Sequence, residues 1–454
     1  PPRSASTPPK PAMKPSSSKK KLKTLSIHPR GFSLRAQSIE PPPIAWLMEQ
    51  KLKRPNLISL AAGFTDPETL PVEETGHIVH AWTQHKSQAR EILQYGTGSG
   101  REHLRILTAR RIADLDQMPS KGKTHDPSKV LITHGSQQFL YLVTEALCDP
   151  GDIVLIESPT YFVYLSILKY FGIQSRSIPL QPDGMDIQHL EEQLEALKKS
   201  GQIKRLKMIY LVSYFQNPTS RNTSLAKKKA MMDLARRYES AAGHPIYLLE
   251  DAAYRELSFG QTPPAPSMLS LPGASKRVIY SGTYSKPFAT GIRVGFGISP
   301  SPLHQTLCHL KGNQDFGTAE FLQAILEKAL SSGTYDRHLE VIRKGYAKKS
   351  DRMCRMIQRH FPASVSWHPP EGGLYVWARL PQPNQTGPQS ALFKASLKAN
   401  VLYVPGCYAF GDDVLGPERQ EAMRLSFGNA NLKMIDEGIR RLGEVIQSIM
   451  KRTS

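Results

Sequence analysis

The chain has 454 residues, 39% of them hydrophobic, and a formal net charge of +20. This length allows one large or two medium cores, so we start from an expectation of two domains. No run approaches the roughly 20 consecutive apolar residues that cross a bilayer, and the first residues lack the apolar segment of a signal peptide. We therefore expect a cytoplasmic protein with no membrane partner.

The first part of the chain is basic and rich in Pro, Ser and Lys. Residues 1–39 contain nine Lys and Arg and no Asp or Glu, so they carry nine of the twenty net charges. Few large apolar residues are present to offset the entropy of ordering, which predicts a disordered basic tail over 1–30. The cluster Lys19, Lys20, Lys21 and Lys23 fits a solvated spacer, a nucleic-acid site, an anionic membrane site or an import signal. We favour the spacer, expect no nucleic-acid partner and leave an organelle-targeting role open.

Secondary-structure patterns begin after this tail. Three prolines at 41–43 followed by IAWLMEQKL predict an extended segment that leads into a helix. Further on, short apolar runs alternate with helical patterns, which is typical of a wound α/β sheet. The predicted buried strands are Lys129–Thr133, Ile153–Glu157, Met208–Val212, Ile246–Glu250 and Arg277–Tyr280. In such sheets ligands bind beyond the carboxyl ends of the strands, so site residues should follow these runs.

The last third has a different pattern. A long helical stretch from about Phe316 leads to SVSWHPPEGGLYVWARL, where a turn opens a strand, and NLKMIDEGIRRLGEVIQSIM predicts a closing helix. This order indicates a second, smaller domain. The four cysteines form no CxxC pair and show no metal-ligand spacing, so we expect four reduced, buried thiols and no metal site. They are Cys148, Cys308, Cys354 and Cys407.

The segment VIYSGTYSKPFATGIRVGFG places Lys286 just after a predicted strand. Taken alone, a lysine at a strand end is an ordinary solvated residue. Here Thr283, Ser285 and Arg293 add two hydroxyls and a guanidinium, which are the donors that a dianionic phosphate needs. A lysine in a desolvated, cationic neighbourhood loses its proton more readily and can attack an aldehyde.

Other polar groups follow the neighbouring strands. Asp251 either caps the next turn or pairs with a protonated ring nitrogen of a cofactor, and Tyr254 lies three residues later. Gly135-Ser136-Gln137 opens a helix and is either a plain turn or a phosphate site. Asn217, before a proline, can donate a hydrogen bond to a ring oxygen.

Two residues further along the chain complete the predicted site. Tyr161 either packs as a half-buried aromatic or stacks on a cofactor ring. Arg424, in AMRLSFGNAN, either forms a structural ion pair or clamps a substrate carboxylate through two parallel hydrogen bonds.

In this order the motifs resemble those of the class I and II, fold-type I aminotransferases that use pyridoxal 5′-phosphate (PLP), in particular the branch with kynurenine/α-aminoadipate and aromatic aminotransferases. The resemblance covers about residues 58–428 and rests on ISLAAGFTDPETLP, LQYGTGSG, HGSQQ, PTY, QNPTS, EDAAY, TYSK with RVGFG, and MRLSFG. It implies a large PLP-binding domain with a mostly parallel, seven-stranded-type sheet in an α/β/α sandwich, a smaller α+β domain, and a homodimer with shared active sites. The implied bounds are 31–75 for an N-terminal arm that joins the small domain, 76–330 for the large domain and 331–454 for the C-terminal part of the small domain.

The resemblance also implies a role for each site residue. Lys286 resembles the Schiff-base lysine and Asp251 the partner of the ring nitrogen, with Asn217 and Tyr254 on the ring oxygen and Tyr161 stacked on the ring. Gly63 would lie near the substrate and Arg424 would bind its carboxylate. The phosphate would be held by Ser136, Gln137, Thr283, Ser285 and Arg293, with Tyr95 reaching it from the other subunit.

Four positions depart from the usual motifs. Asn-Pro-Thr-Gly is here Asn-Pro-Thr-Ser, Ala-Gly-Gly is Ala61-Ala62-Gly63, Ala253 replaces a Pro and Thr283 replaces a Ser. Because each predicted catalytic group is kept, we expect transamination between an α-amino acid (aromatic, aminoadipate-like or branched/aliphatic) and a 2-oxo acid. One alternative is another PLP reaction, such as that of a β-lyase or a synthase. A second is the ligand sensor of a transcription regulator, for which residues 1–39 are too short and too rich in Pro to form a winged DNA-binding domain.

Overall fold

The computed structural model describes residues 31–39, 41–118 and 124–453. They belong to two compact units, one that ends at Ile39 and one that spans Glu40–Ser454. The first contains the short helix α1 (Leu34–Ser38), whose N-cap side chain, Ser33, accepts a hydrogen bond from the amide of Ala36 at 3.2 Å. The predicted disordered tail lies outside the described residues.

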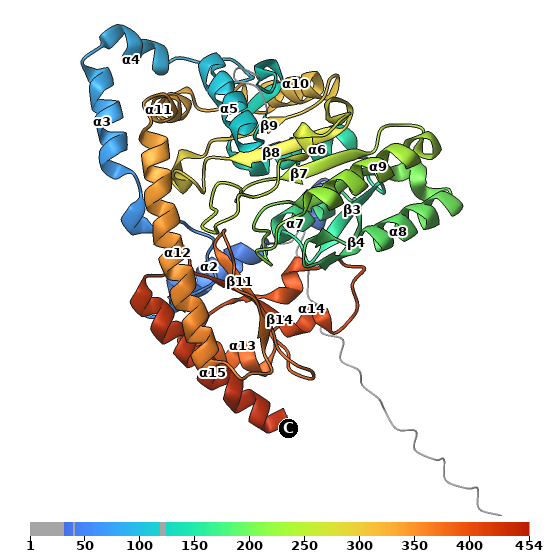
Figure 1. Ribbon diagram of the computed structural model, residues 1–454, viewed down its shortest axis with the longest axis vertical. Coiled ribbons are helices and arrows are strands. Elements are labelled where there is room, and N and C mark those ends of the chain that lie inside the picture. Colours follow the sequence, from blue (N-terminus) through green and yellow to red (C-terminus); the bar gives the residue numbers. More distant parts are fainter. Residues whose placement is uncertain (1–30, 40, 119–123, 454) are drawn as a thin grey trace, which may run out of the picture. The chain divides into compact units, whose positions relative to one another are not determined.

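A mixed sheet of eight strands is the centre of the second unit (Figure 1). The strand order is β2-β9-β8-β7-β6-β3-β4-β5, and the five strands from β8 to β4 run parallel. The strands are β2 (Val130–Thr133), β3 (Ile153–Ser158), β4 (Gln174–Gln181), β5 (Gly184–Met185), β6 (Leu206–Val212), β7 (Tyr247–Asp251), β8 (Val278–Thr283) and β9 (Gly295–Ile298). All five predicted strands are confirmed. The sheet exceeds the expected seven strands by β5, a two-residue strand that folds back antiparallel on β4.

Helices cover both faces of this sheet, as the α/β/α prediction requires. Side chains alternate across a strand, so Ile153 and Leu155 of β3 pack with helices on one face, whereas Val154 and Ile156 pack with those on the other. The first face holds α8 (Ile187–Lys199) and α9 (Leu225–Ala242), and the second holds α6 (Gly135–Leu147), α7 (Phe162–Tyr170) and α10 (Leu303–Asp315). The remaining helices of the chain before residue 120 are α2 (Pro43–Lys53), α3 (Val72–Thr83), α4 (Lys86–Ile92) and α5 (Glu102–Leu115).

A smaller antiparallel sheet is built from the last third of the chain. Its order is β10-β11-β14-β13, with β10 (Ser366–Trp367), β11 (Tyr375–Arg379), β13 (Val404–Pro405) and β14 (Ala422–Ser426). The accompanying helices are α13 (Ala391–Lys398), α14 (Glu418–Glu421) and the closing α15 (Leu432–Thr453). A separate parallel pair joins β1 (Ile58–Ser59) to β12 (Val401–Leu402), so a segment from the start of this unit lies against its C-terminal third.

The predicted helical stretch after Phe316 is two helices. They are α11 (Glu320–Ser331) and the long α12 (Thr334–His360), and the break falls at Gly333, whose φ of +73° suits a residue without Cβ. Helix α12 packs against both α11 and α15, so it connects α11 to a helix that accompanies the small sheet (Figure 1).

The cysteines differ in part from the expectation. All four are free, but only Cys148 is buried. The other three are half-buried because they belong to elements that are only partly buried, namely the helices α10 and α12 and the short turn Gly406–Ala409. Within the described ranges, no three or more His, Cys, Asp or Glu side chains gather where they could hold a metal ion, and no helix is both long and apolar enough to cross a membrane.

Candidate active site

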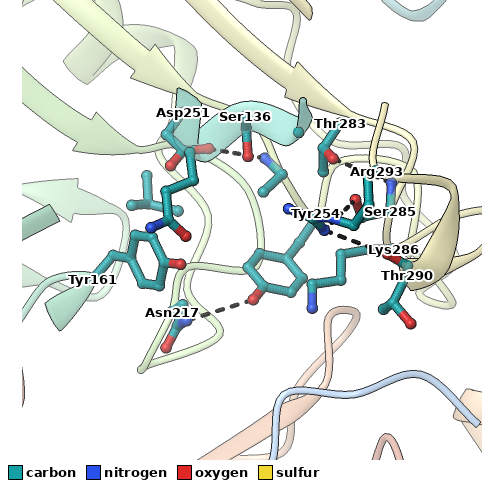
Figure 2. Close-up of a pocket in the computed structure, with 14 residues that line it drawn as sticks. Ser136, Tyr161, Asn217, Asp251, Tyr254, Thr283, Ser285, Lys286, Thr290 and Arg293 are labelled. Carbon is teal, nitrogen blue, oxygen red and sulfur yellow. Dashed lines mark hydrogen bonds between the residues drawn. The ribbon is translucent and has the colours of Figure 1, made fainter. Parts of the chain in front are cut away.

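A pocket opens where β6, β7 and β8 end, beside the start of α6 (Figure 2). Parallel neighbours bring their carboxyl ends to one edge of the sheet, which explains why residues far apart in sequence meet here. Ten of the thirteen predicted site residues line this pocket: Ser136, Gln137, Tyr161, Asn217, Asp251, Tyr254, Thr283, Ser285, Lys286 and Arg293.

One end of the pocket is suited to an anion. Helix α6 starts at Gly135, so the unpaired amides of its first turn and its dipole favour negative charge there. Arg293 donates from Nη1 to the Ser285 hydroxyl at 3.3 Å, and the Ser285 amide donates to Thr283 Oγ1 at 3.1 Å. These groups form a cradle of amides, hydroxyls and one guanidinium, whose donors match the oxygens of a phosphate.

Lys286 lies three residues beyond the end of β8 and is half-buried. Its Nζ donates a hydrogen bond of 2.5 Å to the carbonyl of Gly63, which lies 223 residues earlier in the chain. Burial, followed by repulsion from Arg424 and Arg293, lowers the pKa of Lys286 to about 8. Near neutral pH the amine therefore has a larger neutral, nucleophilic fraction than an ordinary lysine.

Asp251 is the last residue of β7, which ends one residue later than predicted, and it is 3% exposed. Its Oδ1 accepts from the amide of Ala253 at 3.2 Å and its Oδ2 from the Tyr210 hydroxyl at 3.0 Å. It thus caps the turn, as one interpretation of the sequence expected, and it also lines the pocket. Its pairing with a ring nitrogen stays a prediction. Burial raises the pKa of Asp251 to about 6 against the opposing effect of these two donors. A cation placed at this carboxylate would relieve that cost.

Asn217 connects two further groups of the site. Its Nδ2 donates to the Tyr254 hydroxyl at 3.4 Å, while its Oδ1 accepts from Arg424 Nη1 at 2.8 Å. Arg424, 2% exposed, also donates from Nη2 to the carbonyl of Ala61 at 2.9 Å. In the described part of the chain its partners are neutral oxygens and its buried Nε has none, which contradicts a purely structural ion pair and leaves donors for an anion.

Three predicted residues do not line the pocket. Gly63 and Arg424 stand next to it through their bonds to Lys286 and Asn217. Tyr95 lies elsewhere: it is 84% exposed, with its ring edge-on to Phe316 at 5.2 Å. Its expected reach into the site of another subunit stays a prediction.

Sequence reasoning missed Tyr375 of β11. Its hydroxyl lies 2.9 Å from that of Tyr254, and its ring lies under the Arg424 guanidinium at 4.2 Å. The alternating pattern of GGLYVWARL indicated a half-buried strand. Nothing in the sequence indicated which residue Tyr375 would meet 121 positions away.

The comparisons with known proteins agree with this geometry. Residues 56–442 match the family model described as aminotransferase class I and II. The chain is 33% identical to aromatic-amino-acid aminotransferase 1 of Thermococcus litoralis over 96% of this chain and 98% of that protein. The chain belongs to the class I and II aminotransferases. It is a PLP-dependent aminotransferase, an enzyme that moves an amino group between an amino acid and a 2-oxo acid.

Two other relatives bear on the finer questions. The crystal structure of LysN, the α-aminoadipate aminotransferase of Thermus thermophilus complexed with N-(5′-phosphopyridoxyl)-L-leucine, superposes with a TM-score of 0.78 at 30% identity, covering 93% of this chain and 98% of LysN. The aminotransferase chain is also 26% identical to YisV, an uncharacterized HTH-type transcriptional regulator of Bacillus subtilis, over 89% of this chain and 76% of the regulator.

Proposed function

We propose that the aminotransferase carries PLP as a Schiff base on Lys286 and that residues at the two ends of the pocket bind the cofactor. The observation that supports this most is the position of the Lys286 amine, which shares one pocket with an anion cradle and a buried carboxylate. The cradle residues Ser136, Gln137, Thr283, Ser285 and Arg293 would hold the phosphate. Asp251 would hold the ring nitrogen, Asn217 and Tyr254 the ring oxygen, and Tyr161 would stack on the ring.

The donor chemistry of the pocket fits this cofactor at both ends. At the ring end, the charge of Asp251 would be compensated by the protonated pyridine nitrogen, and when bound PLP supplies a ring that accepts the electrons released at the substrate's α-carbon. At the phosphate end, a Cβ on Gly295 would come within 2.4 Å of the Ser136 amide nitrogen, so the close approach of β9 to the start of α6 depends on glycine.

Other residues of the chain would bind the substrate and transfer its proton. Arg424 would hold the substrate carboxylate with a planar guanidinium, close to the reactive end of the pocket because it already contacts Asn217. Gly63, whose carbonyl accepts from Lys286, would lie beside the substrate. The neutral Lys286 amine would act as a general base that takes the proton from the substrate's α-carbon, and then as a general acid that gives it to the carbon of the cofactor's aldehyde group. Asp251 would keep the ring nitrogen protonated throughout.

We further propose an amino donor that is aromatic, aminoadipate-like or branched/aliphatic, and a 2-oxo acid acceptor. The support is the family branch: one relative is named for aromatic amino acids, and another for α-aminoadipate and solved with a leucine adduct. A panel of donors and acceptors tests this. Sustained turnover only with an acceptor present indicates transamination, whereas product formation without one indicates a β-lyase or synthase reaction, and salt-dependent DNA binding would favour a regulator.

We also propose the domain division 31–75, 76–330 and 331–454 and a homodimer with shared sites. The pairing of β1 with β12 supports assigning the early segment to the small domain. The exposed side chains of Leu93, Tyr95 and Phe316, at 74%, 84% and 62%, support a subunit contact near Tyr95, because large exposed apolar groups mark interfaces.

Borohydride reduction of the PLP-loaded enzyme tests the central claim. Reduction fixes the cofactor to the amine that holds it, so peptide mass mapping should find the added mass on Lys286. Lys286→Ala should remove the label and turnover, while Lys204→Ala, which alters an exposed lysine, should leave the label in place. Label on another lysine, or substantial transamination by Lys286→Ala, would refute the assignment.

A further inference from the structure

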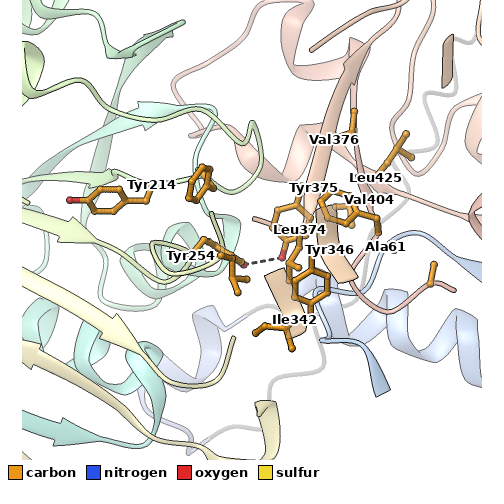
Figure 3. Close-up of a cluster of buried hydrophobic side chains, with 14 of the residues drawn as sticks. Ala61, Tyr214, Tyr254, Ile342, Tyr346, Leu374, Tyr375, Val376, Val404 and Leu425 are labelled. Atoms are coloured by element: carbon orange, nitrogen blue, oxygen red, sulfur yellow. Dashed lines mark hydrogen bonds between the residues drawn. The ribbon is translucent and has the colours of Figure 1, made fainter. Parts of the chain in front are cut away.

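Tyr375 contacts three parts of the site at once. It is 1% exposed and belongs to β11 of the small sheet, whereas Tyr254 follows β7 of the large sheet. Figure 3 shows the two phenols pointing toward each other across this boundary. A deeply buried hydroxyl is costly unless it forms a hydrogen bond, so this bond fixes how β11 lies against the segment that follows β7.

The Tyr375 hydroxyl lies close to both Tyr254 and Gly63. It lies 2.9 Å from the Tyr254 hydroxyl, and a Cβ built on Gly63 would lie 2.6 Å from it. Gly63 is also the residue whose carbonyl accepts from Lys286. The Tyr375 hydroxyl therefore lies between Tyr254 and the loop residue Gly63, whose carbonyl contacts Lys286.

Which hydroxyl donates in the Tyr254–Tyr375 hydrogen bond is inferred from the other bonds of Tyr254. Tyr254 accepts from Asn217 Nδ2 at 3.4 Å, and its own proton is the one that would be donated to the cofactor's ring oxygen. Either hydroxyl can donate in this pair, and the proposed role of Tyr254 makes Tyr375 the donor. Donation into a hydroxyl strengthens that hydroxyl as a donor in turn, because hydrogen bonds in a chain polarise one another.

The ring of Tyr375 has a second contact. The Arg424 guanidinium lies 4.2 Å from the ring centroid, a favourable cation–π distance. The backbone is fixed as well, since the Ser220 hydroxyl donates to the carbonyl of Tyr375 at 2.7 Å. Ser220 stands at φ +59°, where this chain carries Ser in place of the Gly of the usual motif, so the departure adds a bond that holds Tyr375.

We propose that Tyr375 is a positioning residue that couples the substrate-carboxylate clamp to the ring-oxygen donor, its hydroxyl orienting Tyr254 and its ring supporting Arg424. This rests on the proposed function, because it takes Tyr254 to face the ring oxygen and Arg424 to face the substrate. The two halves of the coupling use different parts of one side chain, so they can be separated by substitution.

Tyr375→Phe removes the hydroxyl and keeps the ring. Tyr254 is then a weaker hydrogen-bond donor, so it neutralises less of the negative charge on the ring oxygen. The proton on the neighbouring nitrogen, which joins Lys286 to the cofactor, is therefore held more tightly. The pH at which the PLP-loaded enzyme changes colour should therefore rise by a few tenths of a unit. We expect kcat to fall roughly two- to tenfold, the value of one hydrogen bond, with KM for the amino acid little changed.

Tyr375→Leu removes the ring as well and should raise KM for the amino acid roughly three- to tenfold beyond the value for Tyr375→Phe, since the guanidinium loses its support. The control is Tyr403→Phe: Tyr403 is equally buried in the small domain, but its hydroxyl donates to the carbonyl of Thr386, away from the site. It should change neither the colour transition nor the kinetics.

The outcomes separate the two proposals. A coloured wild-type enzyme whose Tyr375→Phe variant keeps the wild-type colour transition and kcat would overturn the coupling and leave the PLP assignment intact. A wild-type chain that stays colourless with added PLP would overturn both. Equal shifts in Tyr375→Phe and Tyr403→Phe would indicate general loosening of the fold and contradict a positioning role.

Discussion

At the scale of single residues, the site shifts the pKa values of two groups toward their neutral forms. Burial lowers the pKa of Lys286 to about 8 and raises that of Asp251 to about 6. Both shifts have the same main cause, because desolvation penalises whichever form is charged. The consequences differ: the neutral form of the amine is the nucleophile, whereas a carboxylate that is costly to ionise alone would be stabilised by a cation beside it.

The Lys286 shift predicts the pH dependence of cofactor capture. Below about pH 8 the amine is increasingly protonated and unreactive, and above it the amine is neutral. The rate at which the apo-enzyme forms its coloured complex with PLP should rise between pH 7 and 8 and level off by about pH 9, whereas an ordinary lysine, with a pKa of about 10.4, keeps gaining. Stopped-flow absorbance measures this, with an acetylated lysine amide as the reference amine. A rate that still climbs steeply from pH 9 to 10 would contradict the lowered pKa.

Residue identities could be predicted from the sequence further than their contacts. Lys286 and Asp251 were predicted because each stands at or just beyond the carboxyl end of an apolar run, and Arg293 because it lies seven residues after Lys286 and carries a charge that suits a phosphate. Tyr375 was missed because an aromatic residue in an apolar strand has packing as its default role, and its hydroxyl partner lies 121 positions earlier. Buried Glu157, which accepts from the Val212 amide and from Gln216, was missed because these partners lie 55 and 59 positions later.

At the scale of elements, the strands that could be predicted from the sequence are those made mostly of apolar residues. Strands β3 and β6 are almost wholly buried and were found as apolar runs. Strand β4, QSRSIPLQ, was missed because it lies near the sheet edge and only Ile178 is fully buried, so its sequence is mostly polar. Strand β9, GFGI, was missed because two glycines weaken any strand signal.

The glycines of β9 have a reason in the packing of elements. Gly295 pairs with Thr133 and Thr283 on either side, and a Cβ there would come within 2.4 Å of both Gly135 C and the Ser136 nitrogen. The backbone of β9 thus lies directly against the first turn of α6. The anion cradle depends on this approach.

Gly295→Ala should therefore push β9 and the start of α6 apart. We expect the dissociation constant for PLP to rise at least about tenfold and the free energy of unfolding to fall by about 1–3 kcal/mol, as in other overpacked cores. Equilibrium titration by absorbance and urea unfolding measure the two effects. Gly291→Ala is the control, because a Cβ at Gly291 meets nothing within 4 Å. Equal PLP affinity in Gly295→Ala and wild type would show that the cradle tolerates the shift.

At the scale of the whole molecule, the site draws on segments from most of the chain. Gly63 contacts Lys286, Arg424 of β14 contacts Asn217, and Tyr375 of β11 contacts Tyr254. The large sheet therefore supplies the pocket lining and the small sheet supplies residues that contact this lining, so changes in their relative position would alter both sets of contacts. Tyr95 is the exception, since it is exposed at 84% and takes no part in the pocket of its own chain.

The proposed homodimer gives Tyr95 a place in the site of the partner subunit, and mixing two variants tests this. Tyr95→Ala should weaken the hold on PLP, and Lys286→Ala should abolish turnover. If Tyr95 serves the neighbouring site, a hybrid of the two variants contains one site with both residues intact. Co-refolding equal amounts makes about half of the dimers hybrids, so about one quarter of wild-type activity should return at limiting PLP. Activity no greater than that of Tyr95→Ala alone at the same concentration would show that Tyr95 acts within its own chain or not at all, and a monomer in sedimentation experiments would remove the shared site altogether.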